Sequence, residues 1–95
     1  MNFIEKFFAT IQQPKIYVHT PDPAISENVQ YTLFKLGYHW LDRSTRPKFT
    51  SNKYVVLYRN STSLFTNDYD DVDAYTIEAS VFFEMANSFT LKKLH

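Results

Sequence analysis

The 95-residue chain has no cysteine and one glycine, Gly37, and its formal net charge is zero. Without cysteine it has neither a disulfide framework nor a thiolate metal site. A single glycine also rules out a glycine-rich phosphate-binding loop. No apolar run approaches the roughly 20 residues that span a bilayer. Glu5 and Lys6 interrupt the apolar N-terminus, so we expect no signal peptide and a cytoplasmic location.

Aromatic residues, in contrast, are abundant, with nine Phe, seven Tyr and one Trp. Large rings bury much apolar area per residue, so a chain of this length can form a core. We therefore expect one domain spanning residues 1–95.

A punctuated helix is the strongest local signal. Pro21, Asp22 and Pro23 precede it, and Gly37 supplies the left-handed residue that favours a helix end. Asp22 or Ser26 is the predicted cap. Its apolar stripe consists of Ile25, Val29, Leu33 and Leu36.

The rest of the chain predicts strands, loops and a short amphipathic helix over residues 2–12, which ends before Pro14. The phenylalanines of residues 2–12 make a strand the alternative there. The predicted strands are 15–19, 38–41, 54–58, its hairpin partner 63–66, and a short last strand at 89–91. Residues 42–52 and 67–73 are predicted loops. Residues 75–85 fit both a strand and a helix, and we favour a short helix or an irregular segment.

The predicted fold class is α+β: a small, mostly antiparallel βαβββ-like sheet with one main helix on one face and a short N-terminal helix. A parallel crossover between 15–19 and 38–41 is compatible with this order.

Charge is unevenly distributed along the sequence. Residues 35–59 contain six bases and one acid, whereas residues 60–91 contain six acids and no base. The acids of one loop are Asp68, Asp70, Asp71 and Asp73. Val72 and the missing glycine argue against an EF-hand-type calcium loop. We interpret this loop as a solvated acidic loop. The alternative is a charged patch that mimics phosphate or meets a basic partner.

A basic and aromatic segment at residues 40–59 is the second candidate surface. Its candidate contact residues are Arg43, Arg46, Lys48, Lys53, Tyr58 and Arg59, interleaved with Trp40, Phe49 and Tyr54. Cations neutralise phosphates and exposed rings stack on bases, so RNA, DNA or nucleotide binding is one hypothesis. The zero net charge disfavours it, and the alternative is that the rings belong to the core.

Nothing in the sequence predicts catalysis or a bound cofactor or metal. The three histidines, His19, His39 and His95, lack ligand spacing, and no serine lies in a glycine-rich elbow. No group of residues predicts a catalytic site.

The N-terminal apolar stripe has two interpretations. Phe3, Phe7, Phe8 and Ile11 either complete the core or cover a partner, including a second copy of the chain. The need of a small domain for buried area favours the core.

Three segments carry a resemblance to a known group. They are Leu36-Gly37-Tyr38-His39-Trp40, residues 53–58, and Phe89-Thr90-Leu91-Lys92-Lys93-Leu94. In this order the chain resembles a loose group of small bacteriophage accessory proteins over about residues 15–94. It departs from the group at the N-terminal helix, the acidic loop and Lys92-Lys93. The resemblance implies a non-enzymatic protein made early in infection that binds a host or defence component, and it transfers no functional residue.

These observations lead to two hypotheses about function. The first is a non-catalytic, phage-encoded protein that inhibits a host or antiviral-defence protein by direct contact, through the acidic or the basic segment. The second is a nucleic-acid or nucleotide binder that uses the basic aromatic segment.

Overall fold

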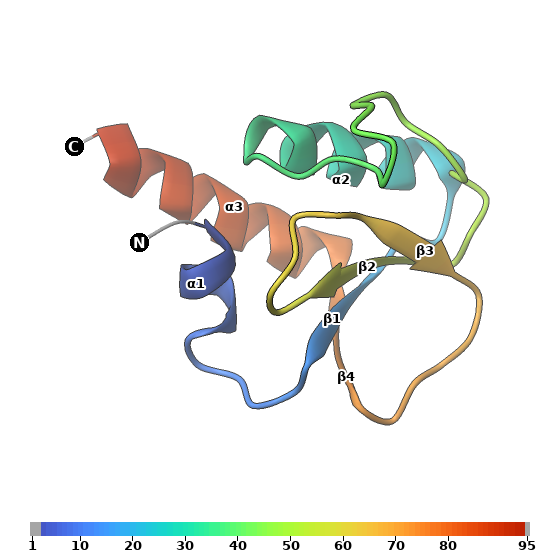
Figure 1. Ribbon diagram of the computed structural model, residues 1–95, viewed down its shortest axis with the longest axis horizontal. Coiled ribbons are helices and arrows are strands. Elements are labelled where there is room, and N and C mark those ends of the chain that lie inside the picture. Colours follow the sequence, from blue (N-terminus) through green and yellow to red (C-terminus); the bar gives the residue numbers. More distant parts are fainter. Residues whose placement is uncertain (1–2, 95) are drawn as a thin grey trace.

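The computed structural model contains a four-stranded mixed sheet and three helices, which confirms the α+β class (Figure 1). It describes the backbone of residues 3–94 and the side chains of residues 5–89. The elements in order are α1 (Phe3–Phe8), β1 (Lys15–His19), α2 (Pro23–Lys35), β2 (Tyr54–Tyr58), β3 (Phe65–Asn67), β4 (Ala74–Glu78) and α3 (Ala79–Leu94).

The strands lie in the order β3-β2-β1-β4. β2 is antiparallel to both of its neighbours, β1 and β3, whereas β1 and β4 are parallel. The sheet is therefore mostly antiparallel, as predicted, and β3 and β4 form its two edges.

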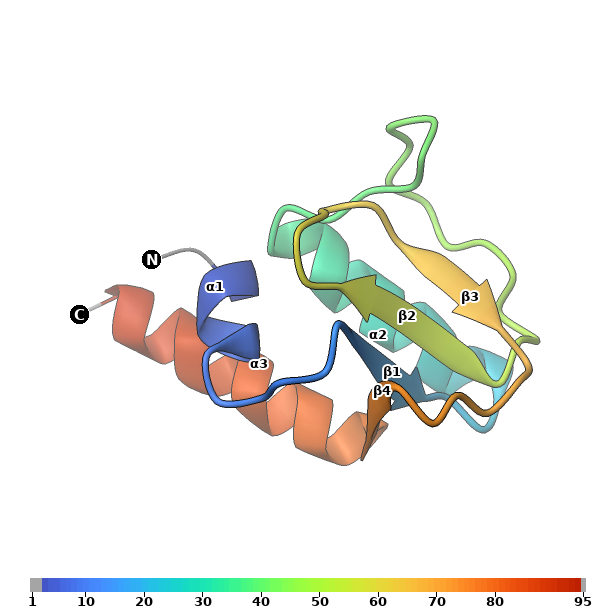
Figure 2. The ribbon, with the colours of Figure 1, turned by 60° about the horizontal axis from the view of Figure 1, so that its bottom comes forward.

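Helices α2 and α3 both cover one face of the sheet (Figures 1 and 2). This face presents alternate residues of the central strands, which share a buried cluster with both helices. Among its members are Ile16, Val18, Val55, Leu57, Val29, Leu33 and Phe82. The prediction named one main helix, but the longer second helix α3 is equally part of this layer.

The N-terminal stripe belongs to this core where it is described. Phe7 and Phe8 are buried, and Ile11 packs against the cluster. The Phe3 side chain lies outside the described residues. The core interpretation is confirmed for the other three positions.

Within residues 3–94, no helix packs on the opposite sheet face. Tyr17, Tyr54 and Val56 form a small buried cluster there. The segment 68–73, which connects β3 to β4, contacts this face through side chains described below. A loop rather than a helix therefore takes part in burying the second face.

Local punctuation sets the bounds of α2 as predicted. Oδ1 of Asp22 accepts a 2.9 Å hydrogen bond from the Ile25 amide, which satisfies one of the free donors at the helix start. Ser26 is fully buried within the helix and is not the cap. Gly37 has φ 103°, in the region that side chains disfavour.

The predicted strand 38–41 was wrong. Only His39 pairs, in a single parallel bridge to Ser63, and β4 rather than this segment is the parallel neighbour of β1. The Trp40 amide instead donates to the Ser44 carbonyl, 3.0 Å away. The chain turns away from the sheet after one pair, so no strand develops.

The ambiguous C-terminal half contains both alternatives in succession. Residues 74–78 form β4, and α3 begins at Ala79, where the buried residues Ala79, Phe82 and Ala86 follow helical spacing. The predicted last strand 89–91 was wrong, because it lies within α3. His95 lies outside the described residues. No helix in the described part of the chain is long and apolar enough to cross a bilayer.

Candidate protein-binding surface at the open sheet edge

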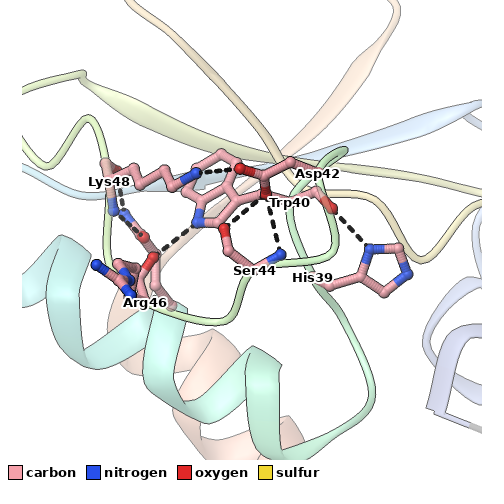
Figure 3. Close-up of polar contacts among 7 residues, drawn as sticks. His39, Trp40, Asp42, Ser44, Arg46 and Lys48 are labelled. Carbon is pink, nitrogen blue, oxygen red and sulfur yellow. Dashed lines mark hydrogen bonds and ion pairs between the residues drawn. The ribbon is translucent and has the colours of Figure 1, made fainter.

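The segment from residue 40 to 52, here called the Trp40 loop, is irregular but tightly held. Trp40 is buried, and its indole Nε1 donates to the Arg46 carbonyl at 2.8 Å (Figure 3). The Arg43 amide donates to the Trp40 carbonyl, also at 2.8 Å. The indole bond and this backbone turn thus hold both arms of the loop at Trp40.

Asp42 organises the exposed side of the same loop. Its carboxylate accepts from the Ser44 hydroxyl at 2.6 Å, the Ser44 amide at 3.0 Å and the Lys48 ammonium at 2.9 Å (Figure 3). The bond from Lys48, followed by those from Ser44, holds the pKa of Asp42 far below its usual range. These three bonds to the carboxylate keep the turn closed.

Gln30 of α2 holds the Trp40 loop through hydrogen bonds to the Lys48 backbone. Its side chain is fully buried, and its amide nitrogen donates to the Lys48 carbonyl at 2.8 Å and to the Ser26 hydroxyl at 3.1 Å. Its oxygen accepts from the Lys48 amide at 2.9 Å. This two-way pairing substitutes for the backbone bonds that a strand would provide.

Two residues of the loop adopt left-handed backbone conformations. Arg43 has φ 71° and Phe49 has φ 54°. Such angles are unfavourable for a bulky side chain, and they persist where the surroundings over-determine them, often at functional sites. In the Trp40 loop the strained positions hold Arg43 and Phe49 on the surface.

A groove of about 530 Å³ runs between the Trp40 loop and the outer edge of β3. Its lining residues are Trp40, Leu41, Asp42, Lys48, Phe49, Asn52, Leu64, Phe65 and Thr66. Leu41 is 73% exposed and Phe49 is 62% exposed, although the Phe49 ring contacts Trp40 edge-on at 5.6 Å. Apolar side chains held this far into water by a rigid loop form a surface suited to contact another molecule.

The predicted basic segment is divided among different roles. Arg43 and Arg46 are exposed, and their guanidinium groups have no partner among the described side chains. Lys48 pairs with Asp42 within the groove wall. Tyr58 lies on the helix-free face of the sheet, on the same side of β2 as Tyr54 and Val56, and its ring is 5.0 Å from that of Phe65.

Arg59 has a structural position. Its guanidinium donates to the carbonyls of Phe8, Ile11 and Gln13 at 3.1, 2.9 and 2.7 Å, and it stacks on the Phe8 ring. These bonds tie the α1–β1 connection to the end of β2. A cation used in this way is not available to a phosphate.

The predicted acidic loop is likewise engaged within the fold. Asp68 accepts from the Lys53 amide, Asp70 accepts from the Tyr54 hydroxyl, and Asp71 pairs with Lys15. Asp73 donates its backbone amide to Asp71, and its carboxylate has no partner among the described residues. The loop therefore joins strands β1 and β2 across the helix-free sheet face.

The opposite charges of the two segments also meet each other. Lys53, from the basic segment, lies 3.5 Å from Asp70 of the acidic loop. The Tyr54 hydroxyl, followed by Lys53, lowers the pKa of Asp70, and Lys15 lowers the pKa of Asp71. Charges that are separated along the sequence are thus partly neutralised in space.

Three residues of the groove, and Gln30, which holds the Trp40 loop, carried no signal in the sequence analysis. Leu41, Phe65 and Thr66 have ordinary residue types, and Gln30 lies in a helix where glutamine is usually solvated. The one available clue was Gln30 on the side of α2 that also carries Val29 and Leu33, since a buried amide requires a partner.

No three His, Asp or Glu side chains of the described residues are grouped so as to hold a metal ion. No protein-family model, curated protein or solved structure matches the chain.

Proposed function

We propose that the protein is a non-catalytic binding module that acts by direct protein–protein contact through the groove beside β3. The observation that carries this proposal is the conformation of the Trp40 loop. Hydrogen bonds from Gln30 and from the Trp40 indole hold the loop in place, yet its Leu41 and Phe49 side chains are exposed to solvent. A loop that is already ordered loses little entropy when a partner binds.

The chemistry of the surface supports a protein partner. Interfaces are enriched in aromatic residues and arginine, with apolar centres and polar rims. Phe49, Phe65 and Leu41 supply such a centre, and Arg43 and Arg46 lie next to residues of the groove wall.

A nucleic-acid ligand is less well supported by the same geometry. Trp40 and Tyr54 are buried, so neither ring is open for stacking on a base. Lys48, Lys53 and Arg59 are engaged within the protein. Of the six candidate residues of that segment, only Arg43 and Arg46 are cations without a charged partner among the described side chains, which is a weak positive field for a polyanion.

The partner class follows from the sequence resemblance. Similarity to small phage accessory proteins leads us to propose a host or antiviral-defence protein in the cytoplasm of an infected cell. In this proposal, inhibition is steric: the partner loses access to its own ligand while it occupies the groove.

The test is affinity capture from a bacterial lysate with the full chain as bait. The groove variant combines Leu41→Ser with Phe49→Asn, because asparagine tolerates a left-handed backbone. The matched control combines Tyr69→Ser with Val72→Ser, since these two side chains are also highly exposed, at 78% and 99%.

We expect a protein that is captured stoichiometrically by the wild type and the control but lost with the groove variant. Capture that survives the groove substitutions and disappears with the control pair would move the binding surface to the acidic loop and refute the proposal.

A further inference from the structure

We propose that the groove takes an extended, apolar and acidic segment of the partner, which adds to the outer edge of β3 as a further strand. This inference rests on the proposed function and specifies its binding mode. The argument comes from the direction of backbone groups, the course of the chain at Leu41, and the charges around the groove.

The ladder shows which backbone groups of β3 face outward. The Thr20 amide donates to the Lys53 carbonyl and the Arg59 amide to the Pro14 carbonyl, so odd-numbered residues of β2 face β1. Residues Tyr54 and Val56 therefore face β3. Because antiparallel strands alternate their bonding direction, their partners Asn67 and Phe65 face back towards β2.

Thr66 is consequently left facing away from the sheet. Its amide and carbonyl point to the groove, which Thr66 lines. Its hydroxyl is positioned by a 2.6 Å bond from the Asn52 side chain. β3 thus offers free backbone groups at an edge that no other strand covers.

The protein itself begins to pair along this row and then stops. The His39 amide donates to the Thr62 carbonyl at 3.0 Å, and the Leu64 amide donates to the His39 carbonyl at 2.8 Å. Continued pairing would place Leu41 beside the Leu64 carbonyl and the Thr66 amide. The chain turns away at Trp40 instead, and the vacated position is the groove.

The side chains in and around the groove define which residues of a partner segment fit there. Phe49, Phe65 and the edge of Trp40 favour an apolar residue. Asp42 and Lys48 neutralise each other in the groove wall. Arg43 and Arg46 belong to the same loop but do not line the groove, and among the described residues they have no charged partner. The charge that complements this surface is negative, so carboxylates next to the apolar residue fit it.

Strand addition is a known mode of peptide recognition, in which backbone bonds give affinity and pockets give specificity. In this groove the bonding groups are the Leu64 carbonyl and the backbone of Thr66. The short length of this edge, three residues in β3, limits the contact to a brief segment.

The probe is a seven-residue peptide that alternates glutamate with valine and has phenylalanine at its centre. Trp40 is the only tryptophan and lines the groove, so its fluorescence reports occupancy. The key variant is Thr66→Pro, which removes the outward amide and leaves the ladder bonds of Phe65 and Asn67 in place. Its matched control is Thr66→Ala, which loses the hydroxyl but keeps the amide.

We expect the peptide to change Trp40 fluorescence and to bind Thr66→Pro about fivefold more weakly than Thr66→Ala, as the loss of one backbone bond implies. A peptide with lysine in place of glutamate should bind the wild-type protein at least as weakly as the glutamate peptide binds Thr66→Pro. Equal binding to the two Thr66 variants, or equal binding of the two peptides to the wild type, would overturn the inference.

Alternate N-methylation of the peptide provides a test that does not depend on the folding of a variant. One set of alternate amides faces β3 and the other set faces away. Two peptides are therefore compared, each methylated on one set, and only the peptide methylated on the set that faces β3 should lose binding. If both methylated peptides bind as the parent does, the segment does not add as a strand. A partner that needs Leu41 and Phe49 but tolerates Thr66→Pro would keep the proposed function and remove strand addition alone.

Discussion

Substitution of Gln30 by methionine should destabilise the protein and loosen the groove together. The two side chains have similar length and helix propensity, so the change mainly removes polar atoms. Gln30 makes three hydrogen bonds, two to the Lys48 backbone and one to the Ser26 hydroxyl. All three partners would lose their bond to the same side chain.

The expected magnitude follows from these contacts. A typical intramolecular hydrogen bond contributes about 1 kcal/mol net, and a buried group that is left unsatisfied costs about 1–3 kcal/mol. The Ser26 hydroxyl is fully buried, whereas Lys48 is half-buried, so water can compensate part of the loss there. We expect about 2–3 kcal/mol in total. For a domain of this size, that corresponds to a decrease in Tm of roughly 10–20 °C.

The assay is urea unfolding followed by Trp40 fluorescence, with the free energy of unfolding compared at constant m-value. Ser26→Ala is the matched control, because it removes only the 3.1 Å bond from Gln30 and should cost about 1 kcal/mol or less. Amide exchange of residues 40–49 should accelerate in Gln30→Met and remain slow in the control.

The reasoning would be refuted if Gln30→Met lost less than about 0.5 kcal/mol, the range of neutral surface changes. A loss of stability without faster exchange in the loop would also contradict the role assigned to Gln30. The buried amide would then stabilise α2 alone.

Two further predictions concern contacts that tie distant segments together. Arg59→Met should cost about 2–4 kcal/mol, because it removes three charge-assisted bonds, and should speed amide exchange at residues 8–13. Arg59→Lys keeps the charge and should lose less. If Arg59→Lys is as stable as the wild type, charge alone matters and the three-bond geometry of the guanidinium contributes nothing. Lys15 lowers the pKa of Asp71, so the stability from this pair is complete above the ordinary value of 3.8 and disappears as pH falls through the depressed value. Urea midpoints should therefore be flat between pH 5 and 8 and fall below about pH 4, more steeply in the wild type than in Asp71→Asn; identical acid profiles would exclude the contribution.

Local chemistry was sufficient where a segment carries its own boundaries. Asp22 and Gly37 defined α2, and the β-branched run at 54–58 defined β2 without reference to the rest of the chain. The alternation of residues 75–85 was also real, but it covers a strand as far as Glu78 and a helix beyond it. Over so short a stretch, the strand and helix periods share positions, so the sequence could not locate the change.

The candidate surfaces show a different relation between sequence and structure. The acidic and basic clusters were visible from composition, but their partners were not. Lys53 and Asp70 lie 17 positions apart in the sequence and are joined by the register of β2 with β3. A side chain looks solvated in the sequence until the fold brings an opposite charge to it.

By itself, the sequence determined the α+β class, the helix α2 with both of its ends, and the strand β2. These features depend on neighbours within a few positions, where backbone preference and hydrophobic period act directly. Only the tertiary structure decided that residues 38–41 leave the sheet after one pair, that Gln30 faces Lys48, and that an unoccupied edge remains beside Thr66. Each of these depends on which distant segments meet, and long-range pairing is set by packing of the whole core rather than by any local preference.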